Sequence, residues 1–473
     1  MKIILAGAGL TGNFIAKYLA QDGYDITVID NDPNTIKEIT DNQSIAGIIG
    51  ECTSIEILKE AGIKAADMFI VVSPDDEINI LACYLANIYG VQIKVARITN
   101  PIYMQEEWQE FLRLKKIPID NIISPGSEII KFMSQRIDYS YLNIIDIFDT
   151  SDGQVKLFSV MCKEDCLVLN RNVNTIQGEA RSNLLFFRIS GILREDIFFI
   201  PTPEEAIRLG DKIFITTLED SIEDSYLLFY ALNETENKFL ESQSPNIIIY
   251  GDHPFIKKLA LELTQYYKKI KVVIPQANEE TETMALELEK NHIQLIIDDI
   301  TNENYRNNYI KSNEDIIIII NKSDEDNILT TLMLKYQSVG NLFCYLSTNH
   351  YENFLLSNGI SHILIPNYFI MSSILTNLRR GIVFNVFSFY NKAELIEIEI
   401  ASSSAAVGRR LGDVEIPGGM IITSLLNEAG KSIFLDEDTL IPANSRITYM
   451  ILRKHIRDIE NIFSQTLELD TII

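Results

Sequence analysis

Short apolar runs alternate with helix-like segments over the first 125 residues of the chain. The first run, residues 3–6, leads into a glycine turn, and the second, residues 26–29, ends at Asp30. Further runs of strand length follow at residues 45–49, 68–72, 92–96 and 121–123. Strands that alternate with helices form right-handed βαβ units, so residues 1–125 are expected to fold as a Rossmann-like, doubly wound parallel sheet.

The pattern changes after residue 125. Residues 127–142 predict a helix that leaves the first domain, and turn signals separate the apolar runs after it. These runs, which predict strands, are residues 155–161, 184–189, 197–200 and 212–217. Region 126–232 is therefore expected to hold an exit helix and a small strand-rich α+β lobe, followed by a polar linker.

The order of elements then repeats along the chain. The strongest internal match pairs residues 76–81 with residues 324–329, and each stretch follows a predicted strand and opens a predicted helix. Region 245–366 is expected to be a second Rossmann-like domain. Region 367–473 is expected to be a second exit helix with its small lobe. The predicted fold class is thus α/β, built from a duplicated unit of a Rossmann-like domain plus a strand-rich lobe.

Bulk composition narrows the function classes. The 473 residues are 47% apolar and 23% charged, which is the balance of a globular chain with several domains. The formal net charge of −25 argues against a nucleic-acid partner, because duplex binding requires a face of lysines and arginines. No apolar stretch reaches the roughly eighteen residues of a membrane span, and the start of the chain predicts a strand rather than a signal peptide. A cytoplasmic protein is expected.

The cysteines and histidines do not form a metal-binding pattern. Cys162 and Cys166 are four residues apart, but no second pair of cysteines or histidines follows at zinc-finger spacing. The five cysteines are interpreted as unrelated reduced thiols, and no metal site is predicted.

The candidate binding motif is GAGLTG at positions 7–12, which follows the first predicted strand and opens a predicted helix. In that context Gly7 permits a tight turn, Gly9 lets a pyrophosphate approach the backbone, and Gly12 lets the helix pack on the sheet. Backbone N–H groups and the helix dipole attract the phosphates, so Leu10 and Thr11 are also counted as binding residues. A glycine turn without a ligand is the alternative.

Acidic residues follow the second predicted strand. Asp30 lies 18 residues after Gly12, where a carboxylate accepts hydrogen bonds from ribose hydroxyls and repels the 2′-phosphate of NADP. Asp32 is better interpreted as the cap of the next helix.

Four further residues are candidates for the same crevice. Cys52 and Thr53 follow the third predicted strand and are candidates for adenine contact, although Thr53 with Glu56 also matches a helix capping box. Ser73 lies at the carboxyl end of the fourth strand, where ligands collect in such sheets. Arg97 ends the fifth strand and either pairs with a phosphate or forms a surface salt bridge.

The second half lacks this motif. Its equivalent turn begins with Gly251, but Asp252 repels phosphate and Pro254 has no backbone N–H, so no dinucleotide is expected there. The strand-rich regions offer no acid/base pair for hydride chemistry, and no phosphate loop or nucleophile elbow is present. A non-enzymatic protein is therefore predicted, with an NAD-dependent oxidoreductase as the alternative.

Long stretches of the chain resemble one known family. They are MKIILAGAGLTGNFIAKYLAQDGYDITVIDND, LKEAGIKAADMFIVVSPDDEINILACYLA, VARITNPIY and VGRRLGDVEIPGGMIITSLLNEAGKSIFLDEDTLIPANSRITYMI. On these stretches, and on the order of its two units, the chain is similar to the TrkA family of Trk potassium-uptake regulators, which are built from tandem RCK (or KTN) domains.

The resemblance implies a function and a set of partners. It implies a regulatory subunit that binds NAD(H) or ATP/ADP, assembles into a homo-oligomeric, tetrameric ring and gates a TrkH-type membrane subunit that translocates potassium. The chain would then be cytoplasmic and peripheral to the inner face of the cell membrane, held there by its partner. An RCK-type regulator of a different cation transporter is the alternative within this class.

The same resemblance assigns roles to the candidate residues. It implies that Gly7, Gly9 and Gly12 hold the phosphates and that Asp30 holds the ribose. It places the adenine beside Cys52 and Thr53, with Ser73 and Arg97 lining the same crevice. Members of the family often keep glycines in both halves, and this chain departs from that pattern.

The two predicted exit helices, residues 127–142 and 369–384, are rich in isoleucine, phenylalanine and leucine. Such apolar surface serves either as an assembly surface between chains or as internal packing within each unit. The sequence leaves both interpretations open.

Overall fold

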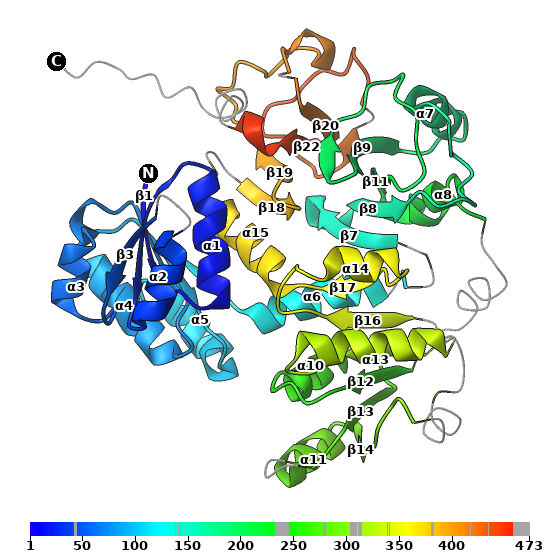
Figure 1. Cartoon of the computed structure of the whole chain (residues 1–473). Coiled ribbons are helices and arrows are strands. Elements are labelled where there is room, and N and C mark those ends of the chain that lie inside the picture. The colour runs from blue at the N-terminus through cyan, green and yellow to red at the C-terminus, as the bar shows by residue number, and fades with distance from the viewer. Residues whose placement is uncertain are drawn as a thin grey trace, which may run out of the picture. The chain divides into compact units, whose positions relative to one another are not determined.

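The computed structural model places its strands in four sheets (Figure 1). It describes residues 1–41, 45–114, 116–137, 139–140, 142, 144–231, 246–277, 281–302, 310, 315–337, 339, 341–379, 383–416, 418–433 and 435–456. Contacts divide the chain into two compact units. One combines Met1–Glu128 with Pro366–Leu378, and the other combines Ile129–Ile365 with the residues from Arg379 onward. No helix in these described ranges is both long and apolar enough to cross a membrane.

The first sheet is parallel and has the strand order β3-β2-β1-β4-β5-β6. Its strands are β1 (Lys2–Ala6), β2 (Asp25–Asp30), β3 (Ala46–Ile49), β4 (Met68–Val71), β5 (Ile93–Arg97) and β6 (Asn121–Ile123). The helices between them are α1 (Leu10–Gln21), α2 (Pro33–Asp41), α3 (Ile55–Glu60), α4 (Asp76–Ile88) and α5 (Glu106–Arg113). This order confirms the predicted Rossmann-like sheet, and it changes direction between β1 and β4, where such sheets bind ligands.

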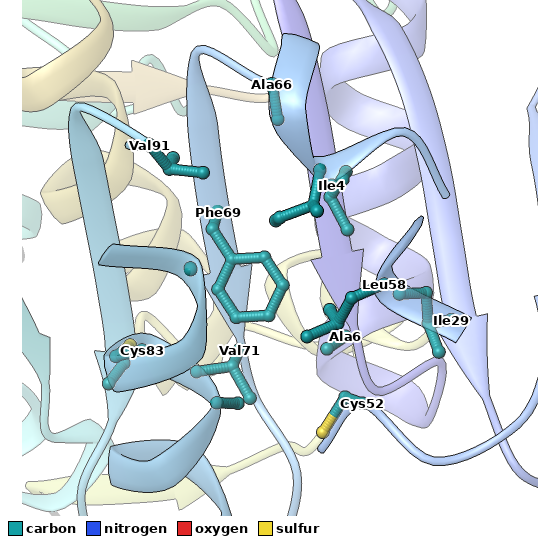
Figure 2. Close-up of a cluster of buried hydrophobic side chains, with 14 of the residues drawn as sticks. Ile4, Ala6, Ile29, Cys52, Leu58, Ala66, Phe69, Val71, Cys83 and Val91 are labelled. Carbon is teal, nitrogen blue, oxygen red and sulfur yellow. The ribbon is translucent and has the colours of Figure 1, made fainter. Parts of the chain in front are cut away.

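The central strands of this sheet are buried on both faces. Burial on both faces explains why the sequence shows them as unbroken apolar runs instead of alternating ones. On one face, Ile4 and Ala6 of β1 lie beside Phe69 and Val71 of β4, with Leu58 of α3 packed against them (Figure 2). This core fixes the carboxyl ends of β1 and β4, between which the glycine turn lies.

The second sheet is antiparallel and has the order β10-β9-β11-β8-β7. Its strands are β7 (Ile144–Thr150), β8 (Val155–Met161), β9 (Phe187–Arg194), β10 (Ile197–Phe199) and β11 (Lys212–Leu218). The helices of this region are α6 (Pro125–Ile137), α7 (Val173–Ser182) and α8 (Ile222–Leu227). The exit helix thus ends five residues earlier than predicted, and the sequence analysis missed β7 and α7.

The second half repeats both sheets, with the orders β14-β13-β12-β15-β16-β17 and β18-β19-β22-β20-β21. The parallel strands are β12 (Ile247–Tyr250), β13 (Ile270–Ile274), β14 (Gln294–Ile297), β15 (Ile316–Ile319), β16 (Leu342–Tyr345) and β17 (His362–Leu364). The antiparallel strands are β18 (Val383–Phe389), β19 (Ala393–Glu399), β20 (Met420–Leu426), β21 (Ser432–Ile433) and β22 (Arg446–Leu452). The duplicated unit predicted from the sequence is confirmed. The four predicted regions hold one sheet each, and the boundaries between them stay predictions.

The remaining helices of the second half are α10 (Ile256–Leu263), α11 (Thr281–Lys290), α13 (Asp324–Tyr336), α14 (Glu352–Ser357) and α15 (Pro366–Leu378). Short 3-10 helices lie at Ile63–Ala65, Pro101–Met104, Ser151–Gly153, Glu219–Ser221, Leu411–Asp413 and Arg453–His455.

Helix α15, from the second half, packs against the first sheet. The Nδ2 of Asn121 on β6 donates to the backbone carbonyl of Ser373 at 3.1 Å, and the rings of Phe14 and Tyr368 lie 6.3 Å apart. Seven residues of α15 are buried, namely Pro366, Asn367, Ile370, Met371, Ile374, Leu375 and Leu378. The apolar side chains of this exit helix therefore serve internal packing, which decides between the two interpretations that the sequence left open for it.

The five cysteines are free thiols, and all of them are buried. Cys52 and Cys83 belong to the core of the first sheet (Figure 2). Cys162 and Cys166 influence each other, because the Cys162 side chain is the main cause that lowers the pKa of Cys166 to about 7.

Candidate functional site

Two of the three motif glycines are required by the fold itself. Gly7 has a φ of 97°, and a Cβ added there would lie 3.1 Å from both the Val72 carbonyl carbon and the Ser73 nitrogen. A Cβ on Gly12 would lie 1.9 Å from the carbonyl oxygen of Gly7, so a larger residue would push α1 away from the turn. These two positions would need glycine even without a ligand.

Gly9 is different, because nothing in the fold requires a glycine there. Its backbone, with φ −58° and ψ −170°, is open to any residue, and no atom lies within 4 Å of an added Cβ. Gly9 immediately precedes α1, whose first-turn N–H groups have no partner within the helix. A side chain at position 9 would occupy the space in which a phosphate approaches these donors, so the residues present fit an anionic ligand.

The Leu10 and Thr11 side chains differ in their surroundings. Leu10 is 68% exposed at the first position of α1, although it is a large apolar residue. The Thr11 hydroxyl lies 3.5 Å from Oδ1 of Asn367 on α15, so its side chain contacts the helix that the second half contributes. The backbone N–H groups of both residues belong to the first turn of α1.

Asp30 ties the glycine turn to the end of β2. Its Oδ2 accepts a hydrogen bond from the Ala8 N–H at 2.6 Å, and its Oδ1 accepts one from the Asp32 N–H at 2.9 Å. Each carboxylate oxygen has a second lone pair, which remains available to a ribose hydroxyl.

Asp32 caps helix α2, as predicted. Its side chain accepts hydrogen bonds from the Asn34 N–H and the Thr35 hydroxyl, both at 2.9 Å. The Asn34 N–H is the larger cause of the lowered pKa of Asp32. A second carboxylate is near, because Glu51 accepts a hydrogen bond from Asn31 at 3.0 Å. Negative charge therefore surrounds the end of β2.

Cys52 and Thr53 follow β3. The Cys52 thiol is buried in the core beside Leu58, and this burial is the main cause that raises its pKa to about 11 (Figure 2). Its backbone is therefore the part left for ligand contact. Thr53 is half-buried, and the capping box predicted for it is wrong, because α3 begins at Ile55 with Ser54 in the capping position.

Ser73 and Arg97 end neighbouring strands, and one buried side chain joins them. Asn79 of α4 accepts a hydrogen bond from the Ser73 hydroxyl at 2.7 Å and donates one to the Arg97 carbonyl at 2.8 Å. Asp76, one turn earlier, accepts hydrogen bonds from the N–H groups of Thr99 at 2.9 Å and Asn100 at 2.7 Å. This Asp–Asn clamp, formed by Asp76 and Asn79, holds together the carboxyl ends of β4 and β5 beside the glycine turn.

Comparisons with known proteins agree with this geometry. Residues 3–125 match the model of the TrkA-N domain. The chain is 28% identical to the Trk system potassium uptake protein TrkA of Azorhizobium caulinodans, over 99% of this chain and 100% of that protein. It is 24% identical to the TrkA protein of Vibrio alginolyticus, over 98% of each. The first domain thus matches the TrkA-N domain model, and nearly the whole chain is similar to TrkA proteins.

Solved structures share the fold of this chain. The crystal structure of the GsuK RCK domain has a TM-score of 0.55 at 13% identity, covering 97% of this chain and 94% of that one. The GsuK channel bound to NAD has a TM-score of 0.53 at 14% identity, covering 97% of this chain and 78% of that one. The tandem RCK architecture implied by the resemblance is thereby confirmed.

The Asp–Asn clamp explains the internal repeat of this chain. In the second half, Asp324 accepts a hydrogen bond from the Ser347 N–H at 2.7 Å, and Asn327 accepts one from the Asn321 N–H at 2.6 Å. The sequence analysis found the repeated stretches without assigning this role. The repeat was the available signal, because both halves keep the same two side chains at the start of equivalent helices.

The turn of the second half is closed by its own residues. Gly251 has a φ of 144°, and a Cβ there would lie 2.1 Å from the Ile320 carbonyl oxygen. Asp252 accepts a hydrogen bond from the Lys322 N–H at 2.9 Å, and Nδ1 of His253 accepts one from the Phe255 N–H at 3.1 Å. The Phe255 N–H corresponds to the Thr11 N–H of the first turn, so a side chain satisfies here a donor that the first turn presents to a ligand.

Proposed function

We propose that this chain is a nucleotide-sensing regulatory subunit of a Trk-type potassium uptake system. The observation that carries the proposal is Gly9, a glycine that the fold does not need but that a phosphate at the start of α1 does need. The full-length relatives are named Trk system potassium uptake proteins, and a solved structure with the same fold is described as bound to NAD. The proposed ligand is NAD(H) or ATP/ADP, bound once per chain in the first half.

Each candidate residue has a part in this proposal. The N–H groups of Leu10 and Thr11 bind the phosphates, and the remaining lone pairs of Asp30 accept the ribose hydroxyls. The carboxylates of Asp30 and Glu51 exclude a 2′-phosphate by repulsion, which favours NAD over NADP. The adenine lies near the backbone of residues 52–53, and Ser73 and Arg97 line the opposite side of the crevice.

Calorimetric titration of the full chain with NAD, NADH, ATP and ADP tests the site. The variant Gly9→Val should fold with an unchanged melting temperature, because no protein atom lies within 4 Å of a Cβ added at position 9, yet it should lose nucleotide binding. Asp252→Ala, in the turn of the second half, is the matched control and should bind like the wild type. Wild-type protein that binds none of the four nucleotides, or Gly9→Val that binds them normally, would contradict the proposal.

We propose that the chain acts without catalysis and together with a membrane subunit of the TrkH type, which holds it at the inner face of the cell membrane. Nucleotide binding changes the ring's shape if the ligand's affinity differs between two states of the ring. A hundredfold difference at one site supplies only about 2.7 kcal/mol, so several chains of one ring must respond together. Sustained oxidation of NADH by the purified chain with an added substrate would instead support the oxidoreductase alternative.

The proposed homo-oligomeric ring requires exposed assembly surfaces, and α4 and α13 offer them. Both helices carry an apolar stripe at helical spacing, and Ile88 and Tyr336 in these stripes are 74% and 92% exposed. The α4 stripe is Leu81, Tyr84 and Ile88, and the α13 stripe is Leu329, Met333 and Tyr336. We propose that a second copy of this chain covers these stripes, since equivalent helices in both halves present them.

A further inference from the structure

Within the second compact unit, an open pocket lies between the two strand-rich lobes, and its volume of about 320 Å³ includes space that is open to solvent. Helix α7 and the start of β9 form the wall from the first lobe, while β20 and the segment after β21 form the wall from the second lobe. Its lining includes Gln177, Arg181, Phe187, Arg188, Thr423 and Leu435. We call this cavity the arginine pocket.

The two arginines of this pocket lack acidic partners. Among the residues that the structure describes, neither Arg181 nor Arg188 forms an ion pair or a hydrogen bond through its side chain. Other arginines of the same lobe are paired, because Arg171 contacts Glu179 at 2.5 Å and Arg194 contacts Asp211 at 2.7 Å. In a chain with a net charge of −25, two uncompensated cations in one cavity are an exception that calls for a ligand.

The surroundings of Arg188 disfavour its positive charge. It lies on β9, opposite Thr216 of β11, and its burial lowers its pKa, while the nearby positive charge of Arg181 lowers it further. A partly buried charge without a partner loses part of its hydration, and an anion placed between the two guanidinium groups would compensate it and offset the repulsion between them.

The pocket also offers a neutral donor. The Oε1 atom of Gln177 accepts a hydrogen bond from the Ile189 N–H at 3.2 Å, which orients the side chain and leaves its NH₂ group as a donor. Guanidinium groups bind phosphate oxygens through pairs of parallel hydrogen bonds. A carboxylate has fewer oxygens than a phosphate group, so it offers fewer acceptors to two guanidinium groups.

We propose that Arg181 and Arg188 form a binding site for a phosphate dianion, either free inorganic phosphate or the terminal phosphoryl group of a small metabolite. The ligand contacts α7 and β9 of the first lobe and faces Thr423 and Leu435 of the second. The site is separate from the glycine turn, which lies in the other compact unit, so it does not depend on the proposed nucleotide site.

Thermal unfolding of the full chain in sodium phosphate, compared with sodium chloride at equal ionic strength, tests this site. Phosphate should raise the melting temperature of the wild type in a saturable manner. Arg188→Met should raise the melting temperature in phosphate-free buffer, because it removes an uncompensated, partly buried charge, and it should abolish the response to phosphate. An arginine with a merely structural role would give the opposite result, a lower melting temperature with an unchanged response.

Three further measurements complete the test. Arg181→Gln, at an exposed position, should weaken phosphate binding roughly tenfold to hundredfold by calorimetry without loss of folding. Arg171→Gln, which removes a paired arginine outside the pocket, should leave phosphate binding unchanged, as should Gly9→Val at the nucleotide site. Tighter binding of glycerol 3-phosphate than of inorganic phosphate would identify a phosphomonoester as the ligand, and the reverse order would identify free phosphate. Absence of saturable binding, or equal binding by Arg181→Gln, would overturn the proposal.

Discussion

The three glycines at positions 7, 9 and 12 meet three different requirements. Gly7 is needed for its positive φ, and Gly12 is needed because the Gly7 carbonyl leaves no room for a Cβ. Gly9 has an ordinary backbone conformation and free space around it. A glycine at a position where the fold accepts any residue therefore points to a ligand.

His362 makes the stability of the chain depend on pH. Burial, and secondarily the charge of Arg136, lower its pKa to about 3, and its ring stacks on Phe343 with centroids 4.6 Å apart. Below pH 6.5 His362 is protonated in the unfolded chain but stays neutral in the folded chain. The stability of the folded chain therefore does not depend on this residue's titration above pH 6.5, and it decreases as the pH falls toward 3. We expect a loss of about 2 kcal/mol between pH 6.5 and pH 5 from this residue.

Urea unfolding of wild type and His362→Leu at pH 7 and pH 5 measures this contribution. The variant should lose less stability than the wild type between the two values. His350→Gln, at an exposed histidine, is the control and should keep the wild-type dependence. If His362→Leu and wild type lose the same free energy of unfolding between pH 7 and pH 5, His362 is not the responsible group.

At the level of elements, strands that are buried on both faces were predicted correctly, whereas strand β7, which carries a buried charge, was missed. The strands of the first sheet were found because burial on both faces makes them unbroken apolar runs. Strand β7 was missed because Asp146 interrupts its apolar pattern. In the structure Asp146 is paired with Arg136 and Lys212, both at 2.6 Å, so the interruption is compensated by partners that are distant in sequence. Such long-range pairing leaves no local signal.

The Asp–Asn clamp links an element to the site, and its two copies give a matched pair of variants. Asp76→Ala should lower the free energy of unfolding by about 2 to 4 kcal/mol, since it leaves the Thr99 and Asn100 donors unsatisfied beside β5. It should also weaken nucleotide binding, because the end of β5 carries Arg97. Asp324→Ala should destabilise the chain similarly without affecting nucleotide affinity. Denaturant unfolding and calorimetric titration of both variants check this, and equal effects on nucleotide affinity would contradict the assigned site.

At the level of the whole molecule, the apolar stripes on α4 and α13 predict association. Ile88→Asp or Tyr336→Asp should reduce the mass of the assembly, because a charge in a buried interface costs several kcal/mol while each position is exposed within one chain. Light scattering coupled to size-exclusion chromatography measures that mass. Leu184→Asp, at an apolar residue 94% exposed outside both stripes, is the control. A ring that stays intact in both stripe variants would place the assembly surface elsewhere.

The arrangement of the whole molecule was only partly accessible from the sequence. The duplication was visible because residues 76–81 and 324–329 share their pattern. The packing of α15 against the first sheet was not, because Asn121 and Ser373 are far apart along the chain and nothing near either residue marks the contact.

The position of α15 also means that the first half of the chain is not self-sufficient. Residues 1–232 expressed alone would lack a helix of their own N-terminal domain and would expose the apolar surface that Ile370, Ile374 and their neighbours now cover. A separately supplied second half would have to reach that surface by diffusion. The covalent link instead presents the helix at an effective concentration on the order of millimolar, so the first domain is completed by the same chain that it begins.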